Sequence, residues 1–284
     1  MELPGSLKEF LAREAWGAVS RCQPVAGGCI NQALRLETQH GPTCLLKVNR
    51  QAPPGLFARE AEGLKALHVP GGPRLPRVFA CADEWIVLEF LAPAGREARF
   101  GQSLGEQLAR LHATTGPAFG FEHDNYLGTT PQPNGWMKDG NEFFAERRLR
   151  HQACLALRRG LLSPEENQGL ERIALRLPQL IPSQPPSLMH GDLWGGNVIV
   201  GPGGEPVLID PAAHYGWAEA ELAMTSLFGG FDAAFYSAYE GARTVAPNYR
   251  ERFPLYNLYH LLNHLNLFGA AYHPAVSSIL RHYC

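Results

Sequence analysis

The amino-acid sequence predicts an α+β protein built from two lobes of unequal size. Patterns typical of strands, short apolar or alternating runs that end at turn residues, are concentrated in the first 90 residues. Beyond them, apolar residues recur mainly at helical spacing. We therefore expect a small β-rich lobe over residues 1–91 and a larger α-helical lobe over residues 92–284, joined near Phe90 to Pro93.

The first lobe is expected to begin with a short helix. Ser6 and Glu9 have the spacing of a capping box, in which each residue satisfies a backbone N–H of the other. Leu7, Phe10 and Leu11 then share one helical face. Residues 24–38 are expected to form a glycine-containing turn that runs into a strand, and further strands are expected over residues 43–48, 77–81 and 85–90 and a helix over 57–67.

Helix signals dominate the second lobe. Ser103 and Glu106 form a second potential capping box, and an amphipathic run covers residues 143–159. Ser163 followed by Pro164 indicates the start of another helix, because proline is favoured at the first helical position. We expect a loop and a small hairpin over residues 187–210, and further helices from residue 219 onward.

The composition excludes several classes of protein. A net charge of −2 gives no electrostatic reason to expect nucleic acid or an anionic membrane as a partner. The first ten residues lack the apolar core of a secretory signal, and no run reaches the roughly 18 apolar residues of a membrane helix. The six cysteines form no CxxC pair, which favours reduced thiols. We expect a cytoplasmic protein.

The strongest chemical signal is the segment HGDLWGGN at residues 190–197. Protein kinases use H-R-D-x-x-x-x-N, in which the aspartate accepts the substrate proton and the asparagine ligates magnesium. Asp192 and Asn197 have the same separation, 197 − 192 = 5. Asp210 follows a hydrophobic strand and matches the second magnesium ligand, although proline follows it instead of phenylalanine. A lone HGD is weak evidence, but these three residues in this order predict a protein-kinase-like phosphotransferase that uses ATP and Mg²⁺.

Lys47 lies inside the apolar run LLKV. A buried lysine is costly unless its ammonium group is paired, and a kinase site would pair it with the ATP phosphates and a helix glutamate. Glu60, 13 residues later, is the natural partner. The alternative is an exposed lysine on a sheet with one solvated face.

Two further segments are candidate ATP contacts. Gly27 and Gly28 lie between two expected strands, where backbone N–H groups would cover the phosphates. On its own such a pair is more often an ordinary hairpin turn. The backbone of Glu89, Phe90 and Leu91 would pair with the adenine edge, although by sequence this segment is simply the end of a buried strand.

The chain resembles the fructosamine kinase (ketosamine-3-kinase) family over nearly its full length. The block FGFEHDNYLGTTPQPN and the motif HGDLWGGN are far more specific than the general kinase pattern. Choline and aminoglycoside kinases share HGD…N but lack the first block. The similar segments are residues 27–31, 45–49, 57–64, 119–134, 190–197, 228–231 and 256–269.

The resemblance implies phosphorylation of a sugar hydroxyl on a ketosamine, at the third carbon in the family's namesake reaction, as part of protein deglycation. It implies Asp192 as the base and a free or protein-bound ketosamine as the partner, with the protein a monomer or a homodimer. A kinase of another hydroxylated amine, such as an aminoglycoside or choline, is the alternative. A nucleotide-binding pseudokinase is a second alternative, which the retained Lys47, Asp192, Asn197 and Asp210 argue against.

The resemblance also suggests residues that contact the acceptor. Trp194 is expected to line the sugar pocket, with a core aromatic as the alternative reading. His190 and His264 are further candidates, although a buried core histidine is at least as common in the position of His264. Asp124 and Asn125 either bind substrate or stabilise a turn, and we favour the turn.

One cysteine and three departures from the family pattern complete the predictions. Cys29 lies in the expected phosphate loop and is a candidate redox switch. The resemblance suggests this role, because the family is similar to proteins in which the cysteine of this loop can cross-link two chains. The alternative is an inert packing residue. Gly140 stands where we expect tryptophan, and Trp217-Ala218 where we expect polar or basic residues. We expect these departures near the acceptor, where they would affect the choice of sugar.

Overall fold

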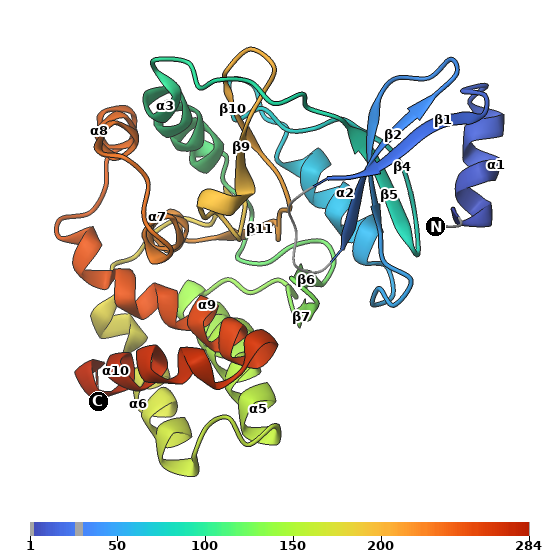
Figure 1. Cartoon of the computed structure of the whole chain (residues 1–284). Coiled ribbons are helices and arrows are strands. Elements are labelled where there is room, and N and C mark those ends of the chain that lie inside the picture. The colour runs from blue at the N-terminus through green and yellow to red at the C-terminus, as the bar shows by residue number, and fades with distance from the viewer. Residues whose placement is uncertain (1–2, 26–30, 284) are drawn as a thin grey trace.

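The structure is a computed structural model that describes residues 3–25 and 31–283, and it has a small sheet region and a larger helical region (Figure 1). The sheet is antiparallel, in the order β1-β2-β3-β5-β4. Its strands are Val19–Pro24 (β1), Gln32–Thr38 (β2), Cys44–Val48 (β3), Val78–Ala82 (β4) and Trp85–Glu89 (β5).

Two helices cover the sheet, α1 (Gly5–Arg13) and α2 (Leu56–Ala66). Successive strand residues point to opposite faces, so β5 serves both helices. Val87 packs with the residues of α1, whereas Ile86 and Leu88 pack with those of α2. Strand β5 is therefore buried on both faces, which explains its apolar run.

The expected capping boxes at Ser6 and Ser103 are wrong. Both helices begin earlier, α1 at Gly5 and α3 at Phe100, and neither has a side-chain cap. Ser6 instead accepts a hydrogen bond from the indole N–H of Trp85 at 2.9 Å, which joins α1 to the sheet. The serine that local spacing predicted to cap the helix therefore makes a tertiary contact instead.

In the helical region, three pairs of short strands lie among the helices. The residues expected to form one amphipathic helix are continuous in the structure but include a π-helical segment, Phe144–Arg150. Helix α9 is buried along most of its length. The helices are α3 (Phe100–Ala113), α4 (Gly140–Phe143), α5 (His151–Arg158), α6 (Pro164–Leu180), α7 (Ala218–Leu227), α8 (Ala233–Ala242), α9 (Phe253–Phe268) and α10 (His273–Tyr283).

Three pairs of short strands complete the described elements. The expected hairpin near residues 187–210 is present as β9 (Val198–Val200) and β10 (Pro206–Leu208). The other pairs are β6 (Asn125–Leu127) with β7 (Thr130–Gln132), and β8 (Ser187–Met189) with β11 (His214–Gly216). The boundary that we predict between residues 91 and 92 lies in the segment that connects β5 to α3.

The start of α6 allows a test of whether the local sequence predicts where a helix begins. Ser163 and Glu166 form a complete capping box there, with Pro164 as the first helical residue. We expect Ser163→Ala to lower the free energy of unfolding by about 1 kcal/mol, because a backbone donor loses its acceptor. Urea unfolding measures this loss. Ser103→Ala is the matched control and should change stability by less than about 0.5 kcal/mol, since Ser103 caps no helix. Equal losses would contradict the assignment.

Candidate active site

The sheet region and the helical region enclose a cleft of about 590 Å³. Charged and amide side chains from distant parts of the sequence meet in it. The residues that we considered as functional candidates and that line this cleft are Lys47, Glu60, Glu89, Phe90, Leu91, Asn125, Asp192, Trp194, Asn197, Asp210 and His264. Gly27, Gly28 and Cys29 lie outside the described residues.

Lys47 is buried on β3, with 7% of its surface exposed. Its ammonium nitrogen lies 2.6 Å from Glu60 Oε1 on α2 and also contacts Asp210 Oδ1. Burial by itself lowers the pKa of Lys47, but the two carboxylates outweigh burial, and the net shift is upward. The lysine therefore stays charged, and the exposed-strand alternative does not describe it.

Asp210 stands at the turn that follows β10. Its φ of +58° lies in the left-handed region, which aspartate tolerates better than most residues. This backbone conformation is local strain of the kind that is found where a side chain must be aimed. The carboxylate contacts Lys47 and is itself half-exposed.

Asp192 and Asn197 are held together by the amide group of Asn197. Its Nδ2 donates to the Asp192 carbonyl at 2.8 Å and to Asp192 Oδ2 at 3.0 Å. Burial raises the pKa of Asp192 to about 7, and the negative charges of Asp210 and Glu221 act in the same direction, whereas the bond from Asn197 opposes them. A carboxyl group with such a pKa can accept a proton near neutral pH.

The oxygen atoms of this cluster fit a magnesium ion. Because Nδ2 of Asn197 donates to Asp192, the amide oxygen of Asn197 is left to accept or coordinate. The Asp210 carboxylate lines the same cleft. Magnesium prefers one or two protein oxygens together with phosphate and water, so these two side chains are sufficient ligands. Among the described residues, no cluster of three or more His, Cys, Asp or Glu side chains suits a metal ion.

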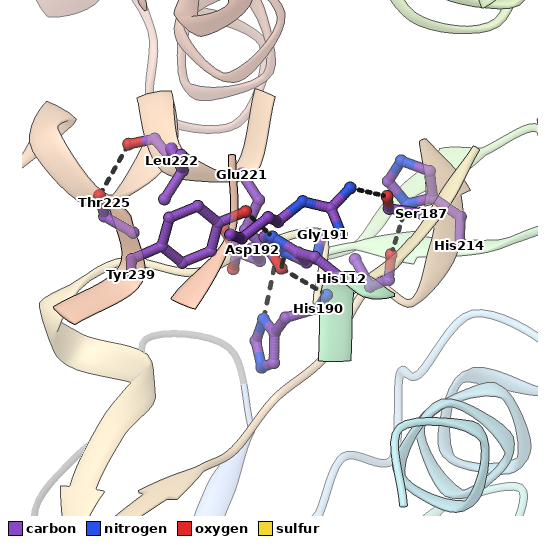
Figure 2. Close-up of polar contacts among 12 residues, drawn as sticks. His112, Ser187, His190, Gly191, Asp192, His214, Glu221, Leu222, Thr225 and Tyr239 are labelled. Carbon is purple, nitrogen blue, oxygen red and sulfur yellow. Dashed lines mark hydrogen bonds and ion pairs between the residues drawn. The ribbon is translucent and has the colours of Figure 1, made fainter. Parts of the chain in front are cut away.

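Residues 190–192 carry the proposed base and are called the catalytic segment below. Glu221 of α7 binds the backbone of this segment directly (Figure 2). Its carboxylate accepts from the N–H of His190 at 2.9 Å and from the N–H of Gly191 at 2.6 Å. Gly191 has a φ of +83°, and a Cβ there would lie 2.2 Å from the carbonyl oxygen of Ala212, so only glycine fits. Glu221 therefore fixes the chain immediately before Asp192.

His112 of α3 completes the surroundings of Glu221 (Figure 2). Its Nε2 lies 2.9 Å from Glu221, and its Nδ1 lies 2.7 Å from the hydroxyl of Tyr239. Burial alone raises the pKa of Glu221, but the hydrogen bonds from His112 and Gly191 reverse the shift and hold it below its ordinary value. Nothing in the local sequence marks His112 as part of this network.

His190 does not take the position that we expected. Its ring is fully buried and does not line the cleft. Nε2 donates to the carbonyl of Ile209 at 2.8 Å, and Nδ1 accepts from the N–H of Asp192 at 3.3 Å. Both ring nitrogens are occupied, so His190 supports the catalytic segment and is unsuited to a substrate contact.

The end of β5 faces the cleft. The N–H of Glu89 donates to the carbonyl of Arg77, and the Glu89 carboxylate pairs with Arg74 at 2.7 Å. Leu91 makes no backbone hydrogen bond to any other residue that the structure describes. Its peptide N–H and carbonyl groups are thus free to bind a ligand in the cleft.

An aromatic wall lines the other end of the cleft. Trp194 is 37% exposed and contacts the edge of Phe228, with ring centres 5.8 Å apart. His264 stacks obliquely on Phe228 at 4.8 Å. Its Nδ1 donates to the His260 carbonyl at 2.8 Å, and burial lowers its pKa, so a neutral ring presents Nε2 as an acceptor.

The comparisons with known proteins agree with this geometry. The family model for fructosamine kinase matches residues 8–284. The chain belongs to the fructosamine kinase family. It is 40% identical to a "probable ketoamine kinase" from Synechocystis sp. over 90% of this chain and 88% of that protein. It is 36% identical to the chloroplastic protein-ribulosamine 3-kinase of Arabidopsis thaliana, over 98% of this chain and 87% of that protein.

A solved structure shares the fold of this fructosamine kinase family member. The crystal structure of a "putative fructosamine-3-kinase" from Thermobifida fusca matches with a TM-score of 0.86 and 33% identity, covering 94% of each chain. The protein-kinase-like arrangement of a small sheet lobe and a helical lobe is therefore confirmed.

The departures from the fructosamine kinase pattern do not lie at the acceptor wall, contrary to our expectation. Trp217 is buried between Phe119, Phe144 and Tyr256 and does not line the cleft. A Cβ on Gly140 would lie 2.8 Å from the indole nitrogen of Trp217. The glycine therefore makes room for the tryptophan, and the two departures compensate for each other in the core.

Asp192 offers a direct test of the electrostatics. We expect its carboxyl group to titrate near pH 7, well above the ordinary value of about 3.9, because burial disfavours the charged form. Carbon-13 NMR of labelled aspartates measures the midpoint, with Asp192→Asn to assign the signal. Glu221→Gln should lower the midpoint, since it removes a nearby negative charge, whereas Glu240→Gln on α8 should not. A midpoint below about 5 would contradict this description.

Proposed function

We propose that this protein is an ATP-dependent kinase that phosphorylates a sugar hydroxyl of ketosamines in protein deglycation. The observation that carries the proposal is the meeting of Lys47, Asp192, Asn197 and Asp210 in one cleft of a fructosamine kinase family member. The relatives named ketoamine kinase and protein-ribulosamine 3-kinase support the choice of acceptor.

The nucleotide occupies the part of the cleft next to the sheet. Its adenine pairs with the backbone around Leu91 and lies against apolar side chains from both lobes, among them Leu45, Leu88 and Ile209. Lys47 binds the phosphates. Mg²⁺, held by Asn197 and Asp210, would neutralise phosphate charge.

Asp192 faces the acceptor. Its Oδ2 is occupied by Asn197, which leaves the other carboxylate oxygen to accept the proton of the sugar hydroxyl. The hydroxyl oxygen bonds to the γ-phosphorus, the bond to the ATP bridging oxygen breaks, and ADP leaves. The protein contributes mainly positioning and electrostatics, because no covalent intermediate is needed.

The acceptor wall favours the sugar part of a ketosamine over a polycation. Trp194 supplies an apolar face, and Nε2 of His264 accepts a hydrogen bond, which together suit a sugar ring or chain. The described residues of this wall, Trp194, Asn263, His264, Leu267 and Phe268, include no carboxylate. An aminoglycoside carries several ammonium groups, which would need carboxylates to hold them.

We further propose that the enzyme acts in the cytoplasm, as a monomer or a homodimer, on free or protein-bound ketosamines. No helix in the described part of the chain is long and apolar enough to cross a membrane. The four described cysteines are free thiols, in keeping with a reducing compartment.

Two variants separate the roles of the carboxylates. Asp192→Ala should abolish phosphoryl transfer and leave ATP affinity nearly unchanged, because Asp192 faces the acceptor. Asp210→Asn should weaken the binding of magnesium–ATP, because it removes a metal ligand and a partner of Lys47. Calorimetric titration with magnesium–ATP, together with turnover assays, measures both effects. Near-normal turnover by folded Asp192→Ala would refute the proposed base.

An acceptor panel tests the substrate class. Ribulosyl-lysine and fructosyl-lysine should be phosphorylated, whereas an aminoglycoside and choline should not be. Trp194→Ala should lower activity on the ketosamines by roughly tenfold, because the sugar loses its apolar wall. Trp136→Ala is the matched control, since Trp136 is similarly exposed at 42% but does not line the cleft. Turnover of choline or the aminoglycoside alone would discard the assignment.

A further inference from the structure

The β6–β7 hairpin has no part in the chemistry described so far, yet it belongs to the block 119–134 that is specific to the family pattern. Figure 1 shows it at the border between the helical region and the sheet region. Asp124 and Asn125, the candidate substrate residues of this block, are both engaged inside the protein. Asp124 accepts from the N–H of Asn134 at 2.7 Å, which stabilises the turn.

One side of the hairpin contacts the sheet lobe. The hydroxyl of Tyr126 donates to the carbonyl of Pro54 at 2.8 Å, two residues before α2 begins. The Tyr126 ring packs on the apolar cluster that contains Leu56 and Phe57 of α2. His123 also pairs with Glu62 of α2 at 2.7 Å, but this pair is exposed and contributes little. Tyr126 differs from His123 in adding apolar packing to its hydrogen bond, and it therefore ties the hairpin to α2 in two ways.

The other side contacts the chain that follows Asp210. Nδ2 of Asn125 donates to the carbonyl of Ala213 at 2.9 Å. Nε2 of Gln132 donates to the carbonyl of Ala212 at 3.1 Å and to Oδ1 of Asn125 at 2.7 Å. Both amides are buried, with 5% and 1% exposed. Buried amide groups must keep their partners, so this network fixes the hairpin on residues 212–213.

Helix α2 meets the same chain directly. A Cβ on Gly63 would lie 3.3 Å from Pro211 and from Ala213, so the helix backbone passes close to this segment. The hairpin, α2 and residues 211–213 thus touch one another. Two of these three elements carry or adjoin the carboxylates that hold Lys47, namely Glu60 on α2 and Asp210.

We propose that the β6–β7 hairpin fixes α2 relative to the Asp210 segment, and that Tyr126 and Gln132 are positioning residues for the Lys47–Glu60–Asp210 cluster. The inference rests on the proposed nucleotide role of that cluster. Glu60 and Asp210 come from different lobes, so a small tilt of α2 moves Glu60 away from Lys47 and misplaces the phosphates. We infer that this part of the family-specific block acts on the alignment of the nucleotide.

Tyr126→Phe tests this role with the least disturbance, because it removes only the hydroxyl. We expect kcat/KM for magnesium–ATP to fall about 2- to 10-fold, the loss of one ordinary hydrogen bond. Tyr249→Phe is the matched control, since Tyr249 donates to Glu240 at 2.7 Å far from the cleft lining, and it should leave kcat/KM unchanged. An unchanged value for Tyr126→Phe would overturn the inference.

A double-mutant cycle with Glu60→Gln distinguishes positioning from a general structural effect. If Tyr126 acts through Glu60, then Tyr126→Phe lowers kcat/KM in the natural protein but not further in the Glu60→Gln background. An equal loss in both backgrounds would overturn the inference while leaving the proposed function intact. A Glu60→Gln enzyme with unchanged kcat/KM would refute the role of Glu60 in the proposed function, and the inference with it.

Discussion

The buried ammonium group of Lys47 is the interaction on which the arrangement of the cleft depends. It stands on β3 and binds Glu60 from α2 and Asp210 from the turn after β10. Removing Lys47 would leave two carboxylates without their cation, and an uncompensated buried charge costs several kcal/mol, about 3–5 in measured cases. The need to neutralise this buried ammonium group therefore holds together the sheet, α2 and the end of the small hairpin, at the place where phosphates would bind.

A second buried charge of opposite sign organises the catalytic segment. Glu221 accepts from two consecutive backbone N–H groups and from His112, so its carboxylate is satisfied without a cationic side chain in direct contact. The negative charge lies close enough to Asp192 to raise its pKa, together with burial and Asp210. The same network thus sets both the position and the basicity of the proposed base, which suits a reaction that depends on positioning.

Motif spacing was sufficient to predict the main residues that meet in the cleft, because each of them stands in a recognisable kinase-like motif. The separation of Asp192 and Asn197 corresponds to one loop, and Asp210 ends the strand that follows. Contacts between distant segments were not predictable in this way. His112 and Glu221 are 109 residues apart, and neither stands in a distinctive pattern.

The same limit explains the errors. Ser6 has the spacing of a helix cap, but its hydroxyl accepts a hydrogen bond from the indole of Trp85. This tryptophan lies on a strand 79 residues away. Gly140 and Trp217 looked like changes of specificity when each was considered separately. Only the fold reveals that they are neighbours and that the glycine accommodates the indole. Local spacing therefore predicted the catalytic set better than it predicted the core that supports it.

The most direct test of the account is a crystal structure with magnesium, a non-hydrolysable ATP analogue and a ketosamine. We predict that one sugar hydroxyl lies within hydrogen-bond distance of Asp192 and faces the γ-phosphate, with the metal on Asn197 and Asp210 and the phosphates on Lys47. A ketosamine bound beyond the reach of Asp192, or a nucleotide that makes no contact with Lys47 and Asp210, would contradict the account.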